Sequence, residues 1–196
     1  MTELERLYAE CESAFRQMQP DEMKTLVFGD GCSVCPPIML IGEAPGEQET
    51  LQGRPFVGKA GKNLDAFLQM MGMERSTMYV SNVVKIRPVE MGKTGRMRNR
   101  APSKDEITFF LPYLKREIEI IQPKVLVSLG NVPLKALLGD SATVGELHGT
   151  WQKTSEGFAL FALYHPAAVI YRRELKVIYE QDVIRLRNSL TIETSK

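Results

Sequence analysis

Four short runs of apolar residues, separated by longer segments with helical periodicity, limit the fold of this chain more than any other feature. The runs cover residues 38–41, 79–84, 125–129 and 158–163. Each is a short run and not a strict alternation of apolar and polar residues, which is typical of strands covered on both faces. Strands that alternate with helices in this way predict an α/β fold with a parallel, doubly wound sheet and right-handed crossovers.

The segments between these runs carry helix boundaries. We expect helices over about residues 3–18, 60–71, 103–121, 131–138 and 174–190. The residues that set the boundaries are Pro20, Gly72 and Gly139 as stops, Asn131 as an N-cap, and Ser103 with Glu106 as a capping box. The glycine-rich segment 42–59 and the basic segment 85–102 show no apolar period, and we predict that both are loops.

Size and composition are those of one globular domain. A chain of 196 residues with 43% hydrophobic residues buries enough surface to hold a core, which excludes disorder and small disulfide scaffolds. We expect a single domain over residues 1–196, with a helix at about 3–18 and a core at about 28–190. No apolar run reaches the roughly 18 residues of a membrane span, and the N-terminus is acidic where a signal peptide is basic. Three cysteines, an odd number, favour reduced thiols, so we expect a cytoplasmic protein. We also expect it to be a monomer.

Basic residues are concentrated in one segment, although the net charge is only +1. Residues 85–104 hold seven basic residues against Glu90 alone. Such a segment favours phosphate binding. The candidates for contacts to a nucleic-acid backbone are Lys93, Arg96, Arg98 and Arg100. The alternative is that the segment is merely solvated, which is the usual state of a charge run.

Polar residues follow or end three of the predicted strands. The first strand leads into residues 42–46 (GEAPG), the second contains Asn82, and the fourth runs into His165. Ligands of open α/β sheets bind at the carboxyl ends of the strands, so the carboxylate of Glu43, the amide and the imidazole are expected to converge. Each residue alone has a simpler explanation, as a solvated acid, a turn amide or a structural histidine. Their coincidence favours a ligand site.

Other motifs are weaker. The glycine-rich segment matches neither the GxGxxG pattern nor a P-loop, which disfavours a nucleotide phosphate site. Cys32 and Cys35 form a CxxC pair without a second pair, so no zinc site is expected. His148 has no matched partner in the sequence, and we expect a structural or surface role for it.

Five segments carry a resemblance to a known family. They read GEAPGEQETLQGRPFVGKAGKNLD, VSNVVKIRP, PKVLVSLGN, ELHGTW and YHPA. In order and spacing they resemble the motifs of the family 4 uracil-DNA glycosylases, over about residues 28–187. The resemblance implies a uracil-DNA glycosylase-like fold, with three αβα layers around a central four-stranded parallel sheet. It also implies hydrolysis of the N-glycosidic bond of deoxyuridine in DNA, which releases uracil and leaves an abasic site in base-excision repair.

The resemblance implies roles for three residues at the site. Phe56 would stack on a uracil that is flipped out of the duplex. The Asn82 amide would accept from uracil N3–H and donate to O4, a pattern that cytosine reverses. His165 would bind O2 and stabilise the negative charge of the leaving base.

Further roles fall on the first motif. Glu43 and Glu49 match acidic positions of the family, and one or both would orient water. The loop around Gly42, Ala44 and Gly46 would bind the substrate, with its amides as a small anion nest. Ala44 stands where related enzymes with a clear water activator carry an aspartate. We therefore expect a base of weaker effect, with leaving-group stabilisation carrying more of the rate.

The segment 167–173, which we expect to be a loop, resembles the part of the family that enters the minor groove beside the flipped base. Ile170 and Tyr171 are the predicted wedge, and Arg172 and Arg173 are predicted to contact phosphates. The implied partner is DNA that contains uracil, and no membrane partner is expected.

The family carries an iron-sulfur cluster held by four cysteines, and this chain departs from that pattern. Two of the ligand positions hold Ile86 and Phe110, and Cys32 with Cys35 lies too close to the first strand to match the other two. We therefore expect no cluster and no metal or other cofactor, with apolar packing in the cluster's place.

Two alternatives stay open on the sequence. The missing cluster and the missing aspartate suit a non-catalytic or differently specific DNA-lesion-binding member of the same fold. A small-nucleotide hydrolase or binding protein would instead bind free nucleotide without a duplex. Preference among uracil, hypoxanthine and xanthine, and between single strand and duplex, does not follow from the sequence.

Overall fold

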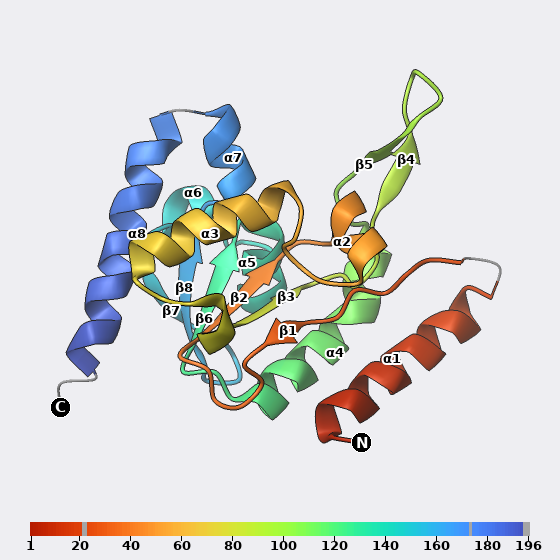
Figure 1. Ribbon diagram of the computed structural model, residues 1–196, viewed down its shortest axis with the longest axis horizontal. Helices are drawn as coiled ribbons and strands as arrows, with labels where there is room; N and C mark the ends of the chain where they lie inside the picture. The colour runs from red at the N-terminus through yellow and green to blue at the C-terminus, as the bar shows by residue number, and fades with distance from the viewer. Residues whose placement is uncertain (21–22, 173, 194–196) are drawn as a thin grey trace.

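A six-stranded sheet forms the centre of the computed structural model, which describes residues 1–20, 23–172 and 174–193 (Figure 1). Across the sheet the strands follow the order β1 (Asp30–Gly31), β3 (Tyr79–Asn82), β2 (Ile38–Gly42), β6 (Val125–Leu129), β8 (Ala159–Leu163) and β7 (Trp151–Lys153). The four central strands run parallel, as predicted, and the short edge strands β1 and β7 run antiparallel to their neighbours. The strand order reverses between β2 and β6, which is where open α/β sheets bind ligands.

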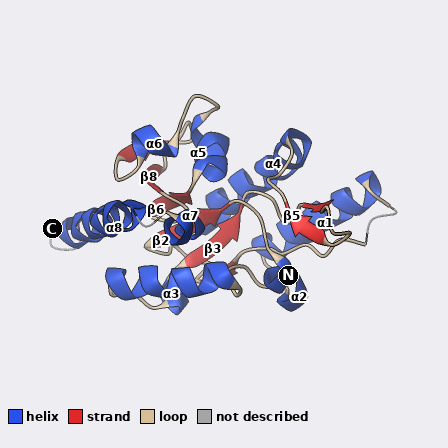
Figure 2. Cartoon of the chain, turned by 90° about the horizontal axis from the view of Figure 1, so that it is seen from above, coloured by secondary structure: helices blue, strands red, loops and turns tan. Residues whose placement is uncertain are grey.

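Helices cover both faces of the sheet and complete the three predicted layers (Figure 2). One face carries α1 (Glu3–Met18), α4 (Lys104–Ile121) and α5 (Asn131–Leu138), and the other carries α3 (Lys59–Met71), α7 (Pro166–Tyr171) and α8 (Glu174–Glu193). Successive side chains of β2 enter different cores. Met39 and Ile41 pack with α1 and α4, whereas Ile38 and Leu40 pack with α3 and α8. The other short helices are α2 (Glu47–Gln52), η1 (Arg75–Thr77) and α6 (Val144–Leu147).

Most of the predicted helix boundaries are confirmed. The capping box starts α4, with Glu106 N donating to Ser103 Oγ at 3.1 Å. Gly72 ends α3 in the left-handed conformation, with a φ of 65° that glycine adopts without strain. The prediction for Asn131 is wrong, because the residue before it is the N-cap of α5. Asn131 Oδ1 instead accepts a hydrogen bond from Val144 N at 2.8 Å and fixes the start of α6.

The basic segment that was predicted to be a loop contains a β-hairpin. Its strands β4 (Val89–Met91) and β5 (Met97–Asn99) pair antiparallel in a separate sheet that projects from the body of the molecule (Figure 1). Gly92 N donates to Arg96 O at 2.9 Å and Gly95 has a φ of 74°, so a tight turn closes the hairpin. Both strands are three residues long and mostly exposed, so no apolar pattern marks them.

Two further segments predicted to be loops contain short helices. The segment after His165 forms α7, with His165 as N-cap and Pro166 as the first helical residue. The segment after Gly46 forms α2. Both helices have six residues, too few for a helical period to be recognised in the sequence. Among the described residues, none of the helices combines the length and the apolar character that a membrane crossing needs.

Candidate active site

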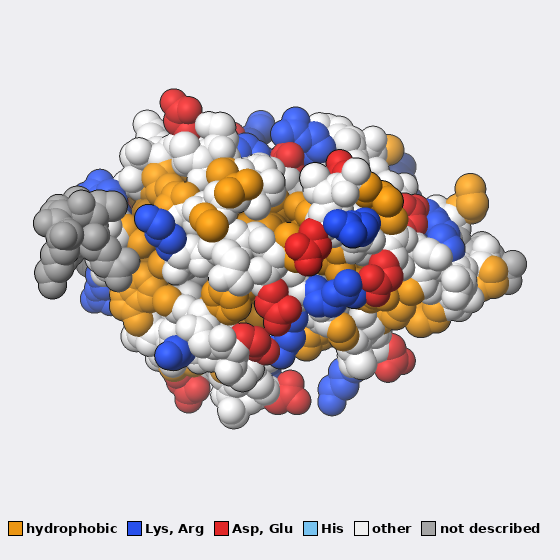
Figure 3. Space-filling view, turned by 90° about the horizontal axis from the view of Figure 1, so that it is seen from below, with side chains coloured by type: hydrophobic (Ala, Val, Ile, Leu, Met, Phe, Trp, Pro, Cys, Tyr) orange, Lys and Arg blue, Asp and Glu red, His pale blue; other side chains and the backbone are white. Residues whose placement is uncertain are grey.

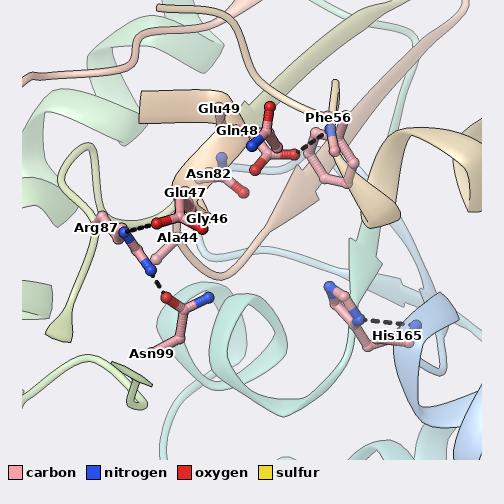
Figure 4. Close-up of a pocket in the computed structure, with 12 residues that line it drawn as sticks. Ala44, Gly46, Glu47, Gln48, Glu49, Phe56, Asn82, Arg87, Asn99 and His165 are labelled. Atoms are coloured by element: carbon pink, nitrogen blue, oxygen red, sulfur yellow. Dashed lines mark hydrogen bonds and ion pairs between the residues drawn. The ribbon is translucent and has the colours of Figure 1, made fainter. Parts of the chain in front are cut away.

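The carboxyl ends of β2, β3 and β8 surround a pocket of about 410 Å³ (Figure 4). Its lining residues are Ala44, Gly46, Glu47, Gln48, Glu49, Phe56, Gly58, Asn82, Arg87, Asn99, His165 and Ala167. The predicted ring, amide and imidazole therefore share one cavity, although they come from distant parts of the sequence. The volume lies in the range of small-molecule sites, about 300–1,000 Å³.

Asn82 is the last residue of β3, and its exposed fraction is only 4%. Gly42 lies opposite it at the end of β2 and is not part of the pocket lining. A Cβ atom at Gly42 would lie 2.4 Å from Asn82 Oδ1 and 2.7 Å from Phe56 Cζ. Because Gly42 has no side chain, the Asn82 amide and the Phe56 ring can occupy this space.

Phe56 lies in the turn between α2 and α3 and has a left-handed φ of 54°, which is unusual for a bulky residue. Arg75 holds this turn through two hydrogen bonds, from NH1 to Phe56 O at 3.0 Å and from NH2 to Pro55 O at 2.6 Å. A Cβ atom at Gly61 would lie 2.4 Å from Phe56 O, so α3 packs directly on the turn. These contacts fix the buried ring at the pocket wall.

His165 follows β8 and begins α7. Its Nδ1 accepts a hydrogen bond from Ala167 N at 3.1 Å, so in the neutral ring the proton is on Nε2. Burial lowers the pKa of this imidazole, because the charged form loses its solvation. The neutral ring therefore presents a hydrogen-bond donor to the pocket (Figure 4).

The two predicted acids differ in position. Glu49 lines the pocket and is 6% exposed. Its Oε1 accepts hydrogen bonds from Val57 N at 3.2 Å and Gly58 N at 2.8 Å. Glu43 is not part of the lining, so the prediction that its carboxylate converges with the amide and the imidazole is wrong for this residue. Burial alone raises the pKa of its carboxyl group. Only one of the two acids is therefore held in the wall of the cavity.

Three polar residues in another part of the wall were not predicted. Arg87 Nε donates to Asn99 Oδ1 at 2.8 Å, and Arg87 NH1 lies 3.3 Å from Glu47 Oε1 (Figure 4). Arg87 lies in the VSNVVKIRP segment and Glu47 in the GEAPGEQE segment, so the motifs of the resemblance could have indicated both. Asn99 is the last residue of β5, in the hairpin that lacks an apolar pattern, and no sequence signal identifies it.

A buried ion pair supports the strand that ends in Asn82. Lys85 Nζ lies 2.7 Å from Glu117 Oε2, and the two side chains are 1% and 0% exposed. The same ammonium group donates to Asn82 O at 2.9 Å and to Ser81 Oγ at 2.7 Å. Tyr8 donates to Glu117 Oε1 at 2.5 Å, so this cluster joins the N-terminal helix to the end of β3.

The predicted backbone-binding residues lie on the hairpin. Lys93, Arg96 and Arg98 are exposed, and Arg98 pairs with an acid of the facing strand. Arg100, after β5, forms a two-point ion pair with Glu106, with both nitrogen–oxygen distances at 2.7 Å. The first three side chains reach solvent, whereas the fourth ties the hairpin to the start of α4.

The predicted minor-groove segment is described only in part. Arg172 is exposed just after α7, whereas the side chains of Ile170 and Tyr171 and the whole of Arg173 lie outside the described residues. The face of the molecule seen in Figure 3 carries acidic and basic side chains side by side, in keeping with the net charge of +1.

The residues present do not fit a four-cysteine iron-sulfur cluster. Ile86 and Phe110 are 0% and 1% exposed and pack in the apolar core, together with the buried Cys11. Cys32 is half-buried and Cys35 exposed, and neither belongs to this core. Apolar side chains supply no ligand atoms, and no group of three or more His, Cys, Asp or Glu residues in the described ranges could hold a metal ion.

Comparisons with known proteins identify the family to which this chain is similar. The model of the family described as "Uracil DNA glycosylase superfamily" matches residues 28–185, a range that includes the whole pocket lining. A type-4 uracil-DNA glycosylase of Sulfurisphaera tokodaii is 40% identical over 158 residues, 76% of this chain and 68% of that protein. The type-4 enzyme of Saccharolobus solfataricus is 35% identical over 86% of this chain and 77% of its own length. The type-4 enzyme of Thermotoga maritima is 33% identical over 80% of this chain and 79% of its own length.

Proposed function

The chain belongs to the uracil-DNA glycosylase superfamily, and on this basis we propose that it hydrolyses the N-glycosidic bond of deoxyuridine in DNA. The reaction releases uracil and leaves an abasic site for base-excision repair. The observation that carries the proposal is the convergence of Phe56, Asn82 and His165 on one pocket at the strand ends. A glycosylase needs such a pocket because its target bond is inaccessible until the nucleotide is flipped out of the duplex.

We assign recognition of the base to Phe56 and Asn82. Stacking on an aromatic ring is worth about 1–3 kcal/mol per base, which offsets the cost of unstacking the nucleotide. Asn82 Oδ1 accepts from uracil N3–H and Nδ2 donates to O4. The amide is almost fully buried, so a cytosine in the pocket would leave both of its ends unpaired, and the pocket would reject that base.

We assign stabilisation of the leaving group to His165. As the bond breaks, negative charge develops on the base, and a donor at O2 lowers the energy of that state. The hydrogen bond from Ala167 N to Nδ1 supports this role because it leaves the proton on Nε2. The Nε2–H group can then donate a hydrogen bond to O2 of the base. The backbone at Ala44 and Gly46 lines the same pocket and is proposed to bind the substrate there.

We assign the positioning of water to Glu49, with Glu43 as the second candidate. Glu49 Oε1 is occupied by two backbone amides, whereas Oε2 accepts no hydrogen bond from any described residue and is available to a water molecule. A carboxylate there also opposes the positive charge that develops on the sugar. Because Ala44 replaces an aspartate, this base is proposed to contribute less than leaving-group stabilisation.

We propose that DNA containing uracil binds along the hairpin and α7. Lys93, Arg96 and Arg98 would contact backbone phosphates, which makes binding salt-dependent. Arg100, whose bonds go to Glu106 and to backbone carbonyls, is the weakest candidate of the four. Beside the flipped base the proposed wedge is Ile170 and Tyr171, and the proposed phosphate contacts are Arg172 and Arg173.

We further propose that the enzyme works without an iron-sulfur cluster, as a monomer in the cytoplasm. The apolar packing of Ile86 and Phe110 supports the first point. Purified protein is expected to lack bound iron and the broad visible absorption of a cluster, and to elute as a single chain of 22.1 kDa in size-exclusion chromatography.

The proposed activity is tested with a labelled oligonucleotide that carries one deoxyuridine, as a single strand and opposite guanine or adenine. Treatment with the enzyme and then with alkali is expected to cut the strand at that position, while a thymidine oligonucleotide stays intact. Retention of the uracil duplex in a binding assay without any strand cleavage would instead identify a lesion-binding protein. Replacing deoxyuridine by deoxyinosine or deoxyxanthosine in the same assay defines the base preference.

A further inference from the structure

One part of the pocket wall has no role in the mechanism above. Phe56 and Asn82 are buried, with exposed fractions of 5% and 4%, whereas the side chains of Glu47 and Arg87 are 64% and 21% exposed. Figure 4 shows Arg87, Asn99 and Glu47 grouped apart from Phe56. The pocket therefore has a buried end and an end that opens to solvent. A nucleotide whose base fills the buried end has its sugar and phosphates toward the open end.

Arg87 is the one Lys or Arg among the lining residues of this pocket. Its Nε is held by Asn99 Oδ1 at 2.8 Å, which fixes the plane of the guanidinium group. A planar fork of donors matches two oxygens of a phosphodiester, and little side-chain freedom is lost when a fork that is already held binds one. The geometry is therefore suited to a phosphate.

Glu47 is the anion that Arg87 contacts in the free protein. The distance from Arg87 NH1 to Glu47 Oε1 is 3.3 Å, and the carboxylate is mostly exposed. Ion pairs this accessible to water contribute little to stability. A phosphate can therefore replace the carboxylate without a large loss, and the two anions would compete for the same group.

We propose that Arg87 binds the phosphodiester beside the flipped deoxyuridine, and that Glu47 occupies the same guanidinium group until DNA arrives. The inference rests on the proposed function, because it requires a nucleotide in the pocket. It assigns Arg87 a contact that differs from those of the hairpin. Residues on the hairpin surface would meet any duplex, whereas Arg87 meets a phosphate only when a base has entered the pocket.

The test compares two duplexes by fluorescence anisotropy over a series of salt concentrations. One carries a deoxyuridine analogue whose glycosidic bond resists hydrolysis, and the other carries thymidine at that position. Arg87→Gln is expected to weaken binding of the first duplex roughly tenfold. It should also reduce the slope of log K against log salt by about 0.9, the value for one phosphate. Binding of the thymidine duplex should not change.

Arg98→Gln is the matched control, since Arg98 is exposed on the hairpin that follows Arg87 in the chain and lies outside the pocket. It is expected to weaken both duplexes equally. Glu47→Gln should have the opposite effect to Arg87→Gln, with roughly two- to threefold tighter binding of the analogue duplex, because the competing anion is removed.

An unchanged salt slope for Arg87→Gln, or equal losses on both duplexes, would overturn the inference. Circular dichroism establishes that the variant is folded. If the Arg87→Gln variant is not folded, the Glu47→Gln variant provides the test. An unchanged affinity of Glu47→Gln for the analogue duplex would then contradict competition between Glu47 and a phosphate for Arg87. Cleavage of the uracil oligonucleotide by the unaltered protein is measured separately. Its absence contradicts the proposed function, whereas cleavage together with a normal slope in Arg87→Gln contradicts the role of Arg87 alone.

Discussion

Asn82 is a buried amide with an acceptor at one end and a donor at the other, so the choice of base depends on the chemistry of one side chain. Asn82→Asp removes the donor and, when protonated, places a proton where cytosine N3 accepts it. Uracil cleavage is expected to fall by about 10²–10³, and cleavage at deoxycytidine is expected to appear. Strand cleavage of oligonucleotides with one deoxyuridine or one deoxycytidine measures both rates.

Asn99→Asp is the matched control, because Asn99 lines the same pocket but lies beside Arg87 and away from the proposed base. It should leave the ratio of uracil to cytosine cleavage unchanged. An Asn82→Asp enzyme that keeps the original preference would contradict the reading of the base by this amide.

His165 makes activity dependent on pH in a direction that its surroundings determine. Protonation at Nδ1 would break the bond from Ala167 N and turn the ring, so the neutral form is the active one. Because burial lowers its pKa below the ordinary histidine value of about 6.5, kcat/KM is expected to fall at a lower pH than it would with a solvated imidazole. His165→Asn should lower kcat by about 10²–10³ and remove that part of the pH profile.

The same shift affects stability. Between the folded and unfolded pKa values of His165, the unfolded chain binds more protons than the folded one. The free energy of unfolding therefore rises with pH in that window, and the contribution of His165 to it is lost as pH falls. His148→Asn is the control, since the chain has two histidines and His148 pairs with Asp182 outside the pocket. If kcat/KM of the His165→Asn variant still falls at low pH, that fall is due to carboxyl groups. Glu43 is one of them, because burial raises its pKa.

The turn that carries Phe56 is held by a neighbouring element, η1. Its first residue, Arg75, donates hydrogen bonds to the carbonyl oxygens of Pro55 and Phe56. Arg75→Met is expected to lower kcat/KM for uracil DNA about tenfold, because two hydrogen bonds worth about 0.5–1.5 kcal/mol each no longer hold a strained turn. If Arg75 acts only through the ring, the same substitution should have almost no further effect in a Phe56→Ala background. This double-mutant cycle separates positioning of the ring from a general loss of stability.

Arg54→Met is the matched control for that cycle. Arg54 binds Asp30 at 2.8 Å, and Arg75 NH2 lies 3.9 Å from the same carboxylate, but only Arg75 reaches the carbonyls of the turn. Arg54→Met should therefore leave kcat/KM within about twofold. Additive losses for Arg75→Met and Phe56→Ala would show that Arg75 does not act through the ring.

At the level of elements, the sequence predicts those that bury a continuous apolar surface. The parallel strands are confirmed because their runs are apolar on both faces, and α4 is confirmed because a capping box and an apolar stripe agree. The hairpin and the helix after His165 were not predicted, since three-residue strands and a six-residue helix bury too little to leave a pattern. Glu117 was missed for a related reason, because a charge on the inner face of a helix has its partner on another element.

For the molecule as a whole, the rule that ligands bind at the carboxyl ends of parallel strands predicted where the pocket lies. Asn82 and His165 lie directly at strand ends and were placed correctly in one cavity. Asn99, the last residue of β5, lines the same cavity and accepts a hydrogen bond there from Arg87, which precedes the hairpin. The sequence thus predicted the part of the pocket that the sheet builds, whereas the part built by a connection between elements required the structure.

The buried cluster around Glu117 joins α1 and α4 to the sheet and supports the strand that carries the base-reading amide. Lys85→Met would leave the Glu117 carboxylate buried without its cation, and unfolding in denaturant is expected to show a loss of about 3–5 kcal/mol. Lys85→Met combined with Glu117→Gln should recover most of that loss, because the uncompensated charge is gone and the amide still accepts from Tyr8. Equal stability of the single and double variants would contradict this. Uracil cleavage by the folded double variant then measures what the bond from Lys85 to Asn82 O contributes to the site, separately from stability.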